Sequence, residues 1–368
     1  MSLKLPLREL RRQPNRFVVA TVVLTFLATL LLFLGGLLDG LYLGSTGAIR
    51  AQQGDAIVFS STARDSFLRS RIDADTRAAV EAVEGVEAVG GLGFVLLGAA
   101  VPGEDDPADV AIAGYELAPA GVPDVATLAD GEGIADDRLQ DQGVGLGDTI
   151  LVGPQAVPVT VVGFTEDTAY LLQGSVWVNL PTWRAVQNAN RPDAAVADTT
   201  VQALVVRGAG GDLPARIDAA TGGATRTLTV DAAVLALPGV EQQESTFNQI
   251  IYSTLVVVLA VVGLFFSLLT LERLGLYGVL KAIGASSGRL FVGVVVQAVV
   301  VSTVAFVAGS LLAIGAAAAL PASLPLQLEP SRFVFTFVAL LVASVLGSAI
   351  SLRRVLRVDP ASAIGTAS

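Results

Sequence analysis

The chain has 368 residues, of which 53% are hydrophobic and 15% are charged, and its formal net charge is −10. It contains no cysteine and no histidine, which excludes disulfides, imidazole metal ligands, Ser–His catalytic triads and histidine proton relays. Because the hydrophobic residues are concentrated in long blocks, the composition favours a membrane protein over a soluble one.

Four apolar stretches are long enough to cross a bilayer, which takes roughly 20 helical residues. The first exceeds the h-region of a signal peptide (roughly 7–15 residues), so we expect a retained anchor. The third is long enough that it must tilt, kink at its glycines or protrude. In chain order we predict a cytoplasmic basic segment at 1–16, a transmembrane helix at 17–38, an extracytoplasmic domain at 39–246, a transmembrane helix at 247–271, a cytoplasmic segment at 272–290, a transmembrane helix at 291–320, an extracytoplasmic loop at 321–332, a transmembrane helix at 333–352 and a cytoplasmic tail at 353–368.

The positive charges predict the orientation of these spans. Lysine and arginine precede the first span, lie between the second and third, and follow the fourth, whereas the 321–332 loop has only Arg332. By the positive-inside rule, both termini and segment 272–290 are cytoplasmic and domain 39–246 lies outside. That domain has 11 arginines, no lysine and 29 acidic residues, a balance of −18. Such acidity disfavours nucleic-acid binding and is typical of an exposed, soluble surface.

The domain at 39–246 is predicted to mix strands and helices without regular alternation, which favours the α+β class. Its first residues, 39–53, are expected to prolong the first membrane helix as a stalk. After the stalk we expect a strand at 54–60, a helix from Asp73 or Asp75 to Gly85 followed by a strand to 100, a strand at 109–117, a short helix and then a strand within 131–153, mostly strand at 156–167, 174–187 and 201–208, a helix around 212–221, a strand at 225–230, and a helix from about 231 to the second span.

Several kinds of chemistry have no support in the sequence. No G-x-x-x-x-G-K-[ST] pattern occurs, so the chain has no P-loop, and we expect neither a catalytic residue nor a cofactor. The acidic pairs Asp105–Asp106 and Asp136–Asp137 are interpreted as solvated turn residues rather than metal ligands. No ionisable residue lies near the centre of a predicted span, which disfavours proton-coupled transporters and ion channels.

Small and polar residues within the spans indicate helix packing. Gln297 is the most polar mid-span residue, and we interpret it as a helix–helix hydrogen-bonding group. Glycines and alanines are expected to let helices approach closely at Gly35–Gly36, Gly309, Gly315 and Ala316–Ala319.

Four motifs resemble those of one protein family. The segment ERLGLYGVLKAIGAS at 272–286 resembles the cytoplasmic loop of FtsX/MacB-type ABC transporter permeases, the mechanotransmission (type VII) class. The basic lead LRELRRQPNRF at 7–17 and the ending RRVLRVDPASAIG at 353–365 are similar to that family's two ends. GVGLGDTI at 143–150, with VTVVGFTED at 159–167, resembles the core of its outer domain. Gly275 and Leu276 depart from the family pattern, which usually has a basic residue and Glu there, and Tyr277 replaces an aliphatic residue.

The resemblance implies a membrane subunit that works with partners. In that family the cytoplasmic loop forms a coupling helix on a separate ABC ATPase subunit, and a second permease copy or a paralogue completes a dimer in the bacterial cell membrane. The outer domain is then an α+β domain of the MacB-like periplasmic core type. The residues that would contact the ATPase are Leu276, Tyr277, Gly278, Val279, Leu280, Lys281, Ile283, Gly284, Ala285 and Ser286.

Other interpretations stay open at this point. The apolar residues of 276–286 include i, i+3 and i+4 neighbours, a pattern that fits a helix docked on a protein but also a helix lying on lipid. Lys281 suits an acidic ATPase residue or an anionic headgroup equally. The chain could also be a non-transporting, FtsX-like regulator of a cell-wall hydrolase, an importer, a lipid or peptide exporter, or a membrane-anchored receptor without an ATPase. The sequence names no substrate and no direction of transport.

Overall fold

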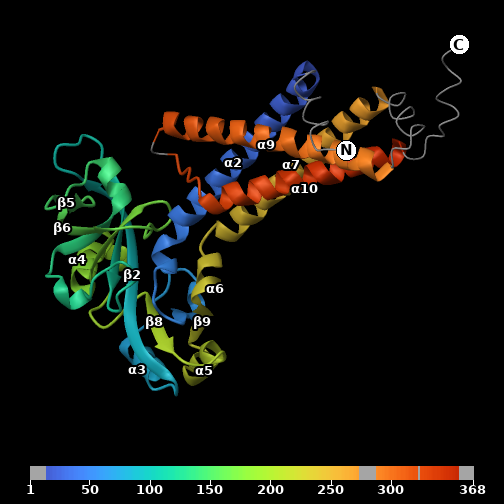
Figure 1. Cartoon of the computed structure of the whole chain (residues 1–368). Helices are drawn as coiled ribbons and strands as arrows, with labels where there is room; N and C mark the ends of the chain where they lie inside the picture. The colour runs from blue at the N-terminus through green and yellow to red at the C-terminus, as the bar shows by residue number, and fades with distance from the viewer. Residues whose placement is uncertain (1–13, 273–286, 322–323, 356–368) are drawn as a thin grey trace, which may run out of the picture. The chain divides into compact units, whose positions relative to one another are not determined.

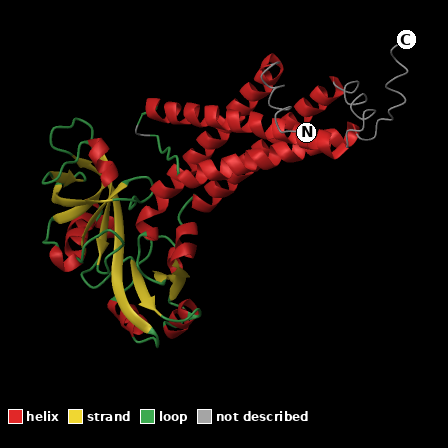
Figure 2. Ribbon diagram, in the orientation of Figure 1, coloured by secondary structure: helices red, strands yellow, loops and turns green. Residues whose placement is uncertain are grey.

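The computed structural model describes residues 14–272, 287–321 and 324–355, and the chain divides into two compact units. The helical unit comprises Met1–Gly40 and Ser245–Ser368, and the sheet unit comprises Leu41–Glu244. Figure 1 labels the elements and Figure 2 separates the two kinds of secondary structure, with strands confined to the sheet unit among the described residues.

Four long helices contain the four apolar stretches. They are α2 (Pro14–Arg50), α7 (Val240–Glu272), α9 (Ser287–Ala319) and α10 (Pro330–Val355). Each is long and apolar enough to cross a membrane, as the sequence predicts. Helix α2 does not end with its apolar run but continues to Arg50 and so enters the sheet unit.

Small residues bring these helices together at several points. On α9, a Cβ added at Gly309 would lie 2.9 Å from the Ala28 side chain of α2, so the predicted close packing at Gly309 is confirmed. The hydroxyls of Ser302 and Ser344 are hydrogen-bonded between α9 and α10. At Gly315, no atom of the described residues lies within 4 Å of an added Cβ, so close packing there stays a prediction.

The sheet unit contains a nine-stranded mixed sheet among the described residues, with strand order β3-β7-β4-β6-β5-β2-β8-β1-β9. Because β2 also pairs with β3, the strands β2, β3, β7, β4, β6 and β5 form a closed circuit, and β2 continues into the open part with β8, β1 and β9. The strands are β1 (Ala56–Ser60), β2 (Val86–Ala100), β3 (Ala108–Tyr115), β4 (Glu132–Asp136), β5 (Thr149–Val152), β6 (Val157–Thr165), β7 (Gly174–Asn179), β8 (Ala203–Gly208) and β9 (Thr225–Thr229).

Helices cover the sheet and bury two apolar clusters. Helices α3 (Ala74–Glu81), α4 (Leu180–Asn190) and α5 (Leu213–Ala220) contribute to one cluster, and α6 (Val230–Leu235) contributes to the other together with the end of α2. Trp183 of α4 lies in a slot made by the paired glycines Gly93 and Gly114, since a Cβ at Gly93 would lie 2.4 Å from its ring. The predicted α+β class of this domain is confirmed.

Three predicted elements differ from the structure. Within 131–153, the expected short helix is the 3-10 helix Asp137–Gln142, but it follows a strand that was not expected, Glu132–Asp136, which is buried and pairs with both β6 and β7. Residues 180–190 form helix α4 rather than strand, since the Asn179 side chain caps its first turn and Pro181 suits that position. The helix expected from about 231 is two helices, and Gly239, with a φ of 84°, lies in the break between them.

Candidate functional site

The predicted ATPase-coupling residues, Leu276–Ser286, lie outside the described residues. The structure gives only the helix ends on either side, because α7 ends at Glu272 and α9 begins at Ser287. Their role therefore stays a prediction. A second set of residues, within the sheet unit, is described in full and holds the end of α2.

The last turns of α2 are buried on all sides. Residues 44–49, which are Gly, Ser, Thr, Gly, Ala and Ile, are all buried, although a helix at a domain surface normally exposes one face. Ala48 and Ile49 belong to the same apolar cluster as the aromatic side chains of Phe94 and Trp177. The end of α2 is thus a core element of the sheet unit.

The loop between β6 and β7, residues 166–173, grips this helix end, and we call it the clamp loop. The amide of Ala48 donates to the Ala169 carbonyl at 3.0 Å. The carbonyl oxygens of Ser45 and Gly44 accept from the amides of Leu171 and Leu172 at 3.1 and 2.9 Å. These three bonds join backbone to backbone, so they hold the helix whatever side chains the loop carries.

The clamp loop has an unusual backbone. Asp167, Leu171 and Leu172 have φ values of 54°, 49° and 70°, in the left-handed region that non-glycine residues seldom adopt. Such conformations cost on the order of 1–3 kcal/mol each and persist only where the surroundings hold them. Here the surroundings are the helix carbonyls and the Tyr170 ring, which is stacked on Phe94 with the centroids 4.2 Å apart.

Two glycines on α2 make room for the clamp. A Cβ at Gly47 would lie 2.7 Å from the Asp167 carbonyl oxygen and 3.0 Å from the Ala169 amide. A Cβ at Gly44 would lie 2.6 Å from the Arg138 guanidinium. At Gly47 the obstacle is backbone, which cannot swing aside as a side chain can, so a larger residue there must displace the loop.

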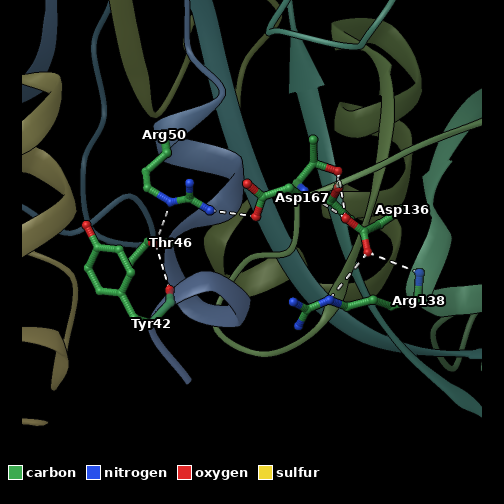
Figure 3. A network of polar contacts seen from close by, with 8 residues as sticks. Tyr42, Thr46, Arg50, Asp136, Arg138 and Asp167 are labelled. Atoms are coloured by element: carbon green, nitrogen blue, oxygen red, sulfur yellow. Dashed lines mark hydrogen bonds and ion pairs between the residues drawn. The ribbon is translucent and has the colours of Figure 1, made fainter. Parts of the chain in front are cut away.

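Side chains add a polar network around the same contact (Figure 3). Arg50, at the end of α2, forms an ion pair with Asp167 at 2.5 Å and donates to the Thr46 hydroxyl at 3.0 Å. Asp167 is 52% exposed, so this pair contributes little more than about 1 kcal/mol.

The buried end of the network is Asp136, at the end of β4. One oxygen of its carboxylate accepts from the amide and the hydroxyl of Thr168, both at 2.8 Å, and the other accepts from the Arg138 amide at 3.3 Å. The Thr168 hydroxyl is also hydrogen-bonded to Ser175 at 2.9 Å. The interpretation of Asp136 as a solvated turn residue is wrong, because its side chain is fully buried and fixes the clamp loop to the sheet.

Burial raises the pKa of Asp136, and the bonds from Thr168 and Arg138 partly offset that effect. Both carboxylate oxygens of Asp136 accept hydrogen bonds from within the sheet unit. Within the described ranges, no group of three or more Asp or Glu side chains could hold a metal ion. The network therefore fixes a helix to a sheet.

Two local features of the sequence are consistent with the clamp. Gly44 and Gly47 lie three residues apart, and residues at that spacing share one face of a helix. The T-E-D-T run at 165–168 contains side chains that favour hydrogen-bonded turns. What the sequence could not indicate is that these two segments, far apart along the chain, meet.

In the helical unit, an open groove of about 430 Å³ lies between α2 and α7. Leu27 and Leu30 line it from α2, and the α7 side carries Thr246, Gln249, Ile250, Ser253, Thr254 and Val257. The groove is apolar on one wall and mixed on the other, and it contains no charged side chain among its lining residues.

Residues 249–360 match the family model described as FtsX-like permease C-terminal. By this match, residues 249–360 form a region similar to the C-terminal part of FtsX-like permeases. It covers α7 from residue 249 onward, α9 and α10, and it includes the predicted coupling segment. The predicted resemblance to this family is confirmed.

Relatives with curated names are permeases of ABC systems. The putative hemin transport system permease protein HrtB of Staphylococcus haemolyticus is 27% identical over 125 residues, which are 34% of this chain and 36% of that protein. The uncharacterized ABC transporter permease Rv2563 of Mycobacterium tuberculosis is 37% identical over 110 residues, 30% of this chain and 31% of that protein. This chain thus aligns with about a third of the length of these two relatives.

Two solved structures of extracytoplasmic regions are similar to part of the chain. The periplasmic region of MacB from Actinobacillus actinomycetemcomitans has a TM-score of 0.35 and 12% identity, and the match covers 50% of this chain and 92% of that one. The extracellular domain of the noncanonic ABC-type transporter YknZ from Gram-positive bacteria has a TM-score of 0.32 and 15% identity, over 47% of this chain and all of that domain.

Our first prediction separates backbone packing from the surface ion pair in the clamp. Gly47→Ala should destabilise the sheet unit by about 1–3 kcal/mol, because the new methyl must push the loop backbone away. Asp167→Asn should cost less than about 1 kcal/mol, since the side chain is largely exposed and Asn tolerates the left-handed backbone as Asp does. Both tryptophans of the chain, Trp177 and Trp183, lie in the sheet unit, so urea unfolding of the full chain followed by tryptophan fluorescence reports on this unit. A larger loss for Asp167→Asn than for Gly47→Ala would contradict the clamp.

A second prediction concerns the pH dependence contributed by Asp136. Asp136→Asn should lower stability by about 1–3 kcal/mol, because its amide group faces N–H or O–H donors that need an acceptor. The folded domain keeps the proton of Asp136 to higher pH than the unfolded chain, where the pKa has its ordinary value of 3.8. The advantage of wild type over the variant should therefore shrink as the pH rises from 3.8 through the raised pKa, and stay constant above it.

The measurement for Asp136 is the urea midpoint of both proteins across the acidic and neutral range, again by tryptophan fluorescence. The difference between two proteins that share all other titrating groups isolates the carboxyl. An advantage that grows with pH would mean that the folded state lowers the pKa of Asp136 and would refute our assignment.

Proposed function

We propose that the chain is the membrane (permease) subunit of an ABC transporter, in which a separate ATPase subunit hydrolyses ATP. The observation that carries the proposal is the match of residues 249–360 to the FtsX-like permease family. The absence of a P-loop from the sequence supports placing ATP hydrolysis in a partner, so the chain itself is not an enzyme.

In this proposal, residues 276–286 form the coupling helix. They lie between α7 and α9 in the chain, so a force applied there acts on both membrane helices. A docked helix explains apolar side chains such as Val279 and Ile283 in a segment between spans, because a dry contact with a partner covers them. Glycines at 278 and 284 would allow close approach.

The proposed topology puts both termini and residues 272–290 in the cytoplasm and domain 39–246 outside a bacterial cell membrane. The distribution of lysine and arginine supports it. Four spans are few for a complete transporter, so we propose that a second permease copy or a paralogue completes the membrane part, with two ATPase subunits.

The proposal names no transported substrate. The names of the staphylococcal relatives refer to hemin, but histidine and cysteine, two of the side chains that commonly hold haem iron, are absent from this sequence. We therefore propose that ATP hydrolysis by the partner moves the membrane helices and the outer domains, whether or not a substrate crosses the bilayer.

The proposal is tested by placing a charged side chain in the expected contact between residues 276–286 and the ATPase subunit. Val279→Asp and Ile283→Asp should each weaken assembly with the ATPase subunit by a few kcal/mol, because an unpaired carboxylate would lose its water. Co-purification of the ATPase and its turnover rate are measured in membranes with equal expression of each variant. Val162→Asp is the matched control, since Val162 is an exposed valine of the sheet unit and this change should leave the complex intact. Full co-purification and full turnover in both coupling variants would show that 276–286 is not the coupling helix.

A further inference from the structure

The end of the apolar part of α2 is held by the connection between α9 and α10. Arg332, in the first turn of α10, binds Asp39 of α2 through two hydrogen bonds, Nε to Oδ2 at 2.9 Å and Nη2 to Oδ1. The two side chains are 19% and 18% exposed, so the pair is largely withdrawn from solvent. Two parallel bonds fix the orientation of both groups as well as their distance.

The backbone of the connection also lies directly on α2. The Gln327 amide donates to the Gly36 carbonyl at 3.0 Å. A Cβ at Gly40 would lie 2.0 Å from the Pro325 carbonyl oxygen, and a Cβ at Gly35 would lie 2.4 Å from the Arg332 side chain. Gly35 and Gly36 were predicted to pack against a helix, but what covers them is this extended segment and one arginine.

Two features make this contact more than incidental packing. An arginine in the first turn of a helix faces the positive end of the helix dipole, which is unfavourable unless an acid compensates it. The first turn of α10 has no acidic residue, and the carboxylate that compensates Arg332 comes from α2. The ion pair with Asp39 therefore compensates the positive charge of Arg332, for which the first turn of α10 provides no acidic partner.

The opposite side of α2 is different. There the groove of about 430 Å³ separates Leu27 and Leu30 from the first half of α7. Helix α7 makes its close contacts further along, where a Cβ at Gly347 of α10 would lie 2.9 Å from the Gly263 amide, and where Phe265 meets Phe17 of α2 with ring centroids 6.2 Å apart. Beside the groove, the first half of α7 is held by apolar side chains such as Ile251, which is 4% exposed, rather than by the close backbone approach found at Gly36 and Gly40.

We propose that residues 325–328 and Arg332 form a latch on Gly35, Gly36, Asp39 and Gly40, so that α2, α9 and α10 behave as one body and α7 moves against it about the Gly263–Gly347 contact. In the latch, the close approach of the Pro325 backbone to Gly40 fixes where the segment lies on α2, and the Asp39–Arg332 ion pair stabilises that contact. It concerns the chain alone and holds whether or not an ATPase subunit binds.

The experiment measures distances within the helical unit by spin-label electron resonance. The chain has no cysteine, so pairs can be introduced at will into the full-length protein in lipid nanodiscs. One pair, Phe26→Cys with Val334→Cys, reports on α2 against α10, and a second, Tyr252→Cys with Val334→Cys, reports on α7 against α10. All three side chains are about 65% exposed, so labels at these positions leave the packing intact.

In the otherwise unchanged protein, the α2–α10 distribution should be a single narrow peak and the α7–α10 distribution at least twice as wide. Gly40→Ala should at least double the width of the α2–α10 peak, and Asp39→Asn, which keeps the shape of the side chain, should widen it less. Gly315→Ala is the control, a glycine of α9 with no atom within 4 Å of the added Cβ, and it should change neither distribution. Unchanged tryptophan fluorescence confirms that each variant keeps its sheet unit folded.

Two results would overturn the proposal. One is an α2–α10 peak that stays equally narrow in Gly40→Ala and in Asp39→Asn, because the latch would then not be what holds α2. The other is an α7–α10 distribution as narrow as the α2–α10 peak, because all four helices would then move together.

Discussion

Close backbone contact at glycines of α2 is the constraint on which the rest of the structure depends. Gly36, Gly40 and Gly44 recur at intervals of four residues, and Gly47 follows. In the helical unit Pro325 approaches Gly40, and in the sheet unit Asp167 approaches Gly47, in both cases with backbone atoms where a Cβ would otherwise stand. Side chains longer than hydrogen at these points would separate α2 from the segments that hold it, and no surface ion pair would compensate.

This constraint suits a protein whose proposed work is mechanical. A helix held by flexible side chains yields when it is pulled, whereas backbone contacts and a buried carboxylate such as Asp136 resist displacement. The three left-handed residues of the clamp loop fit the same pattern, because their backbone is maintained only while the helix end stays in place. In the proposed function, displacement of α2 would therefore move the sheet unit's clamp loop and not merely bend a linker.

The sequence predicted the parts of the molecule that follow from local pattern. Long apolar runs indicated four helices, and β-branched stretches indicated most strands, because both signals are contained in neighbouring residues. The sequence-based predictions were wrong where contacts between distant segments determine the structure. Residues 132–136 form a strand because β6 and β7 pair with them on either side, and the Asp136 carboxylate is buried where it binds Thr168. The predicted coupling residues 276–286 rest on resemblance, whereas the clamp and the latch required the structure. Ion pairs such as Asp39–Arg332 join residues hundreds of positions apart, which no local pattern reports.

The central claim is that α2 crosses the membrane once and carries its clamped end, with the sheet unit, to the outside. Because the chain has no cysteine, single cysteines at Ser61 and Ser287 test this directly with a membrane-impermeant thiol reagent on intact cells. Ser61 is exposed in the sheet unit and Ser287 is the first residue of α9. The account predicts labelling at 61 in intact cells and at 287 only after the membrane is opened. Labelling at 287 but not at 61 in intact cells would contradict it.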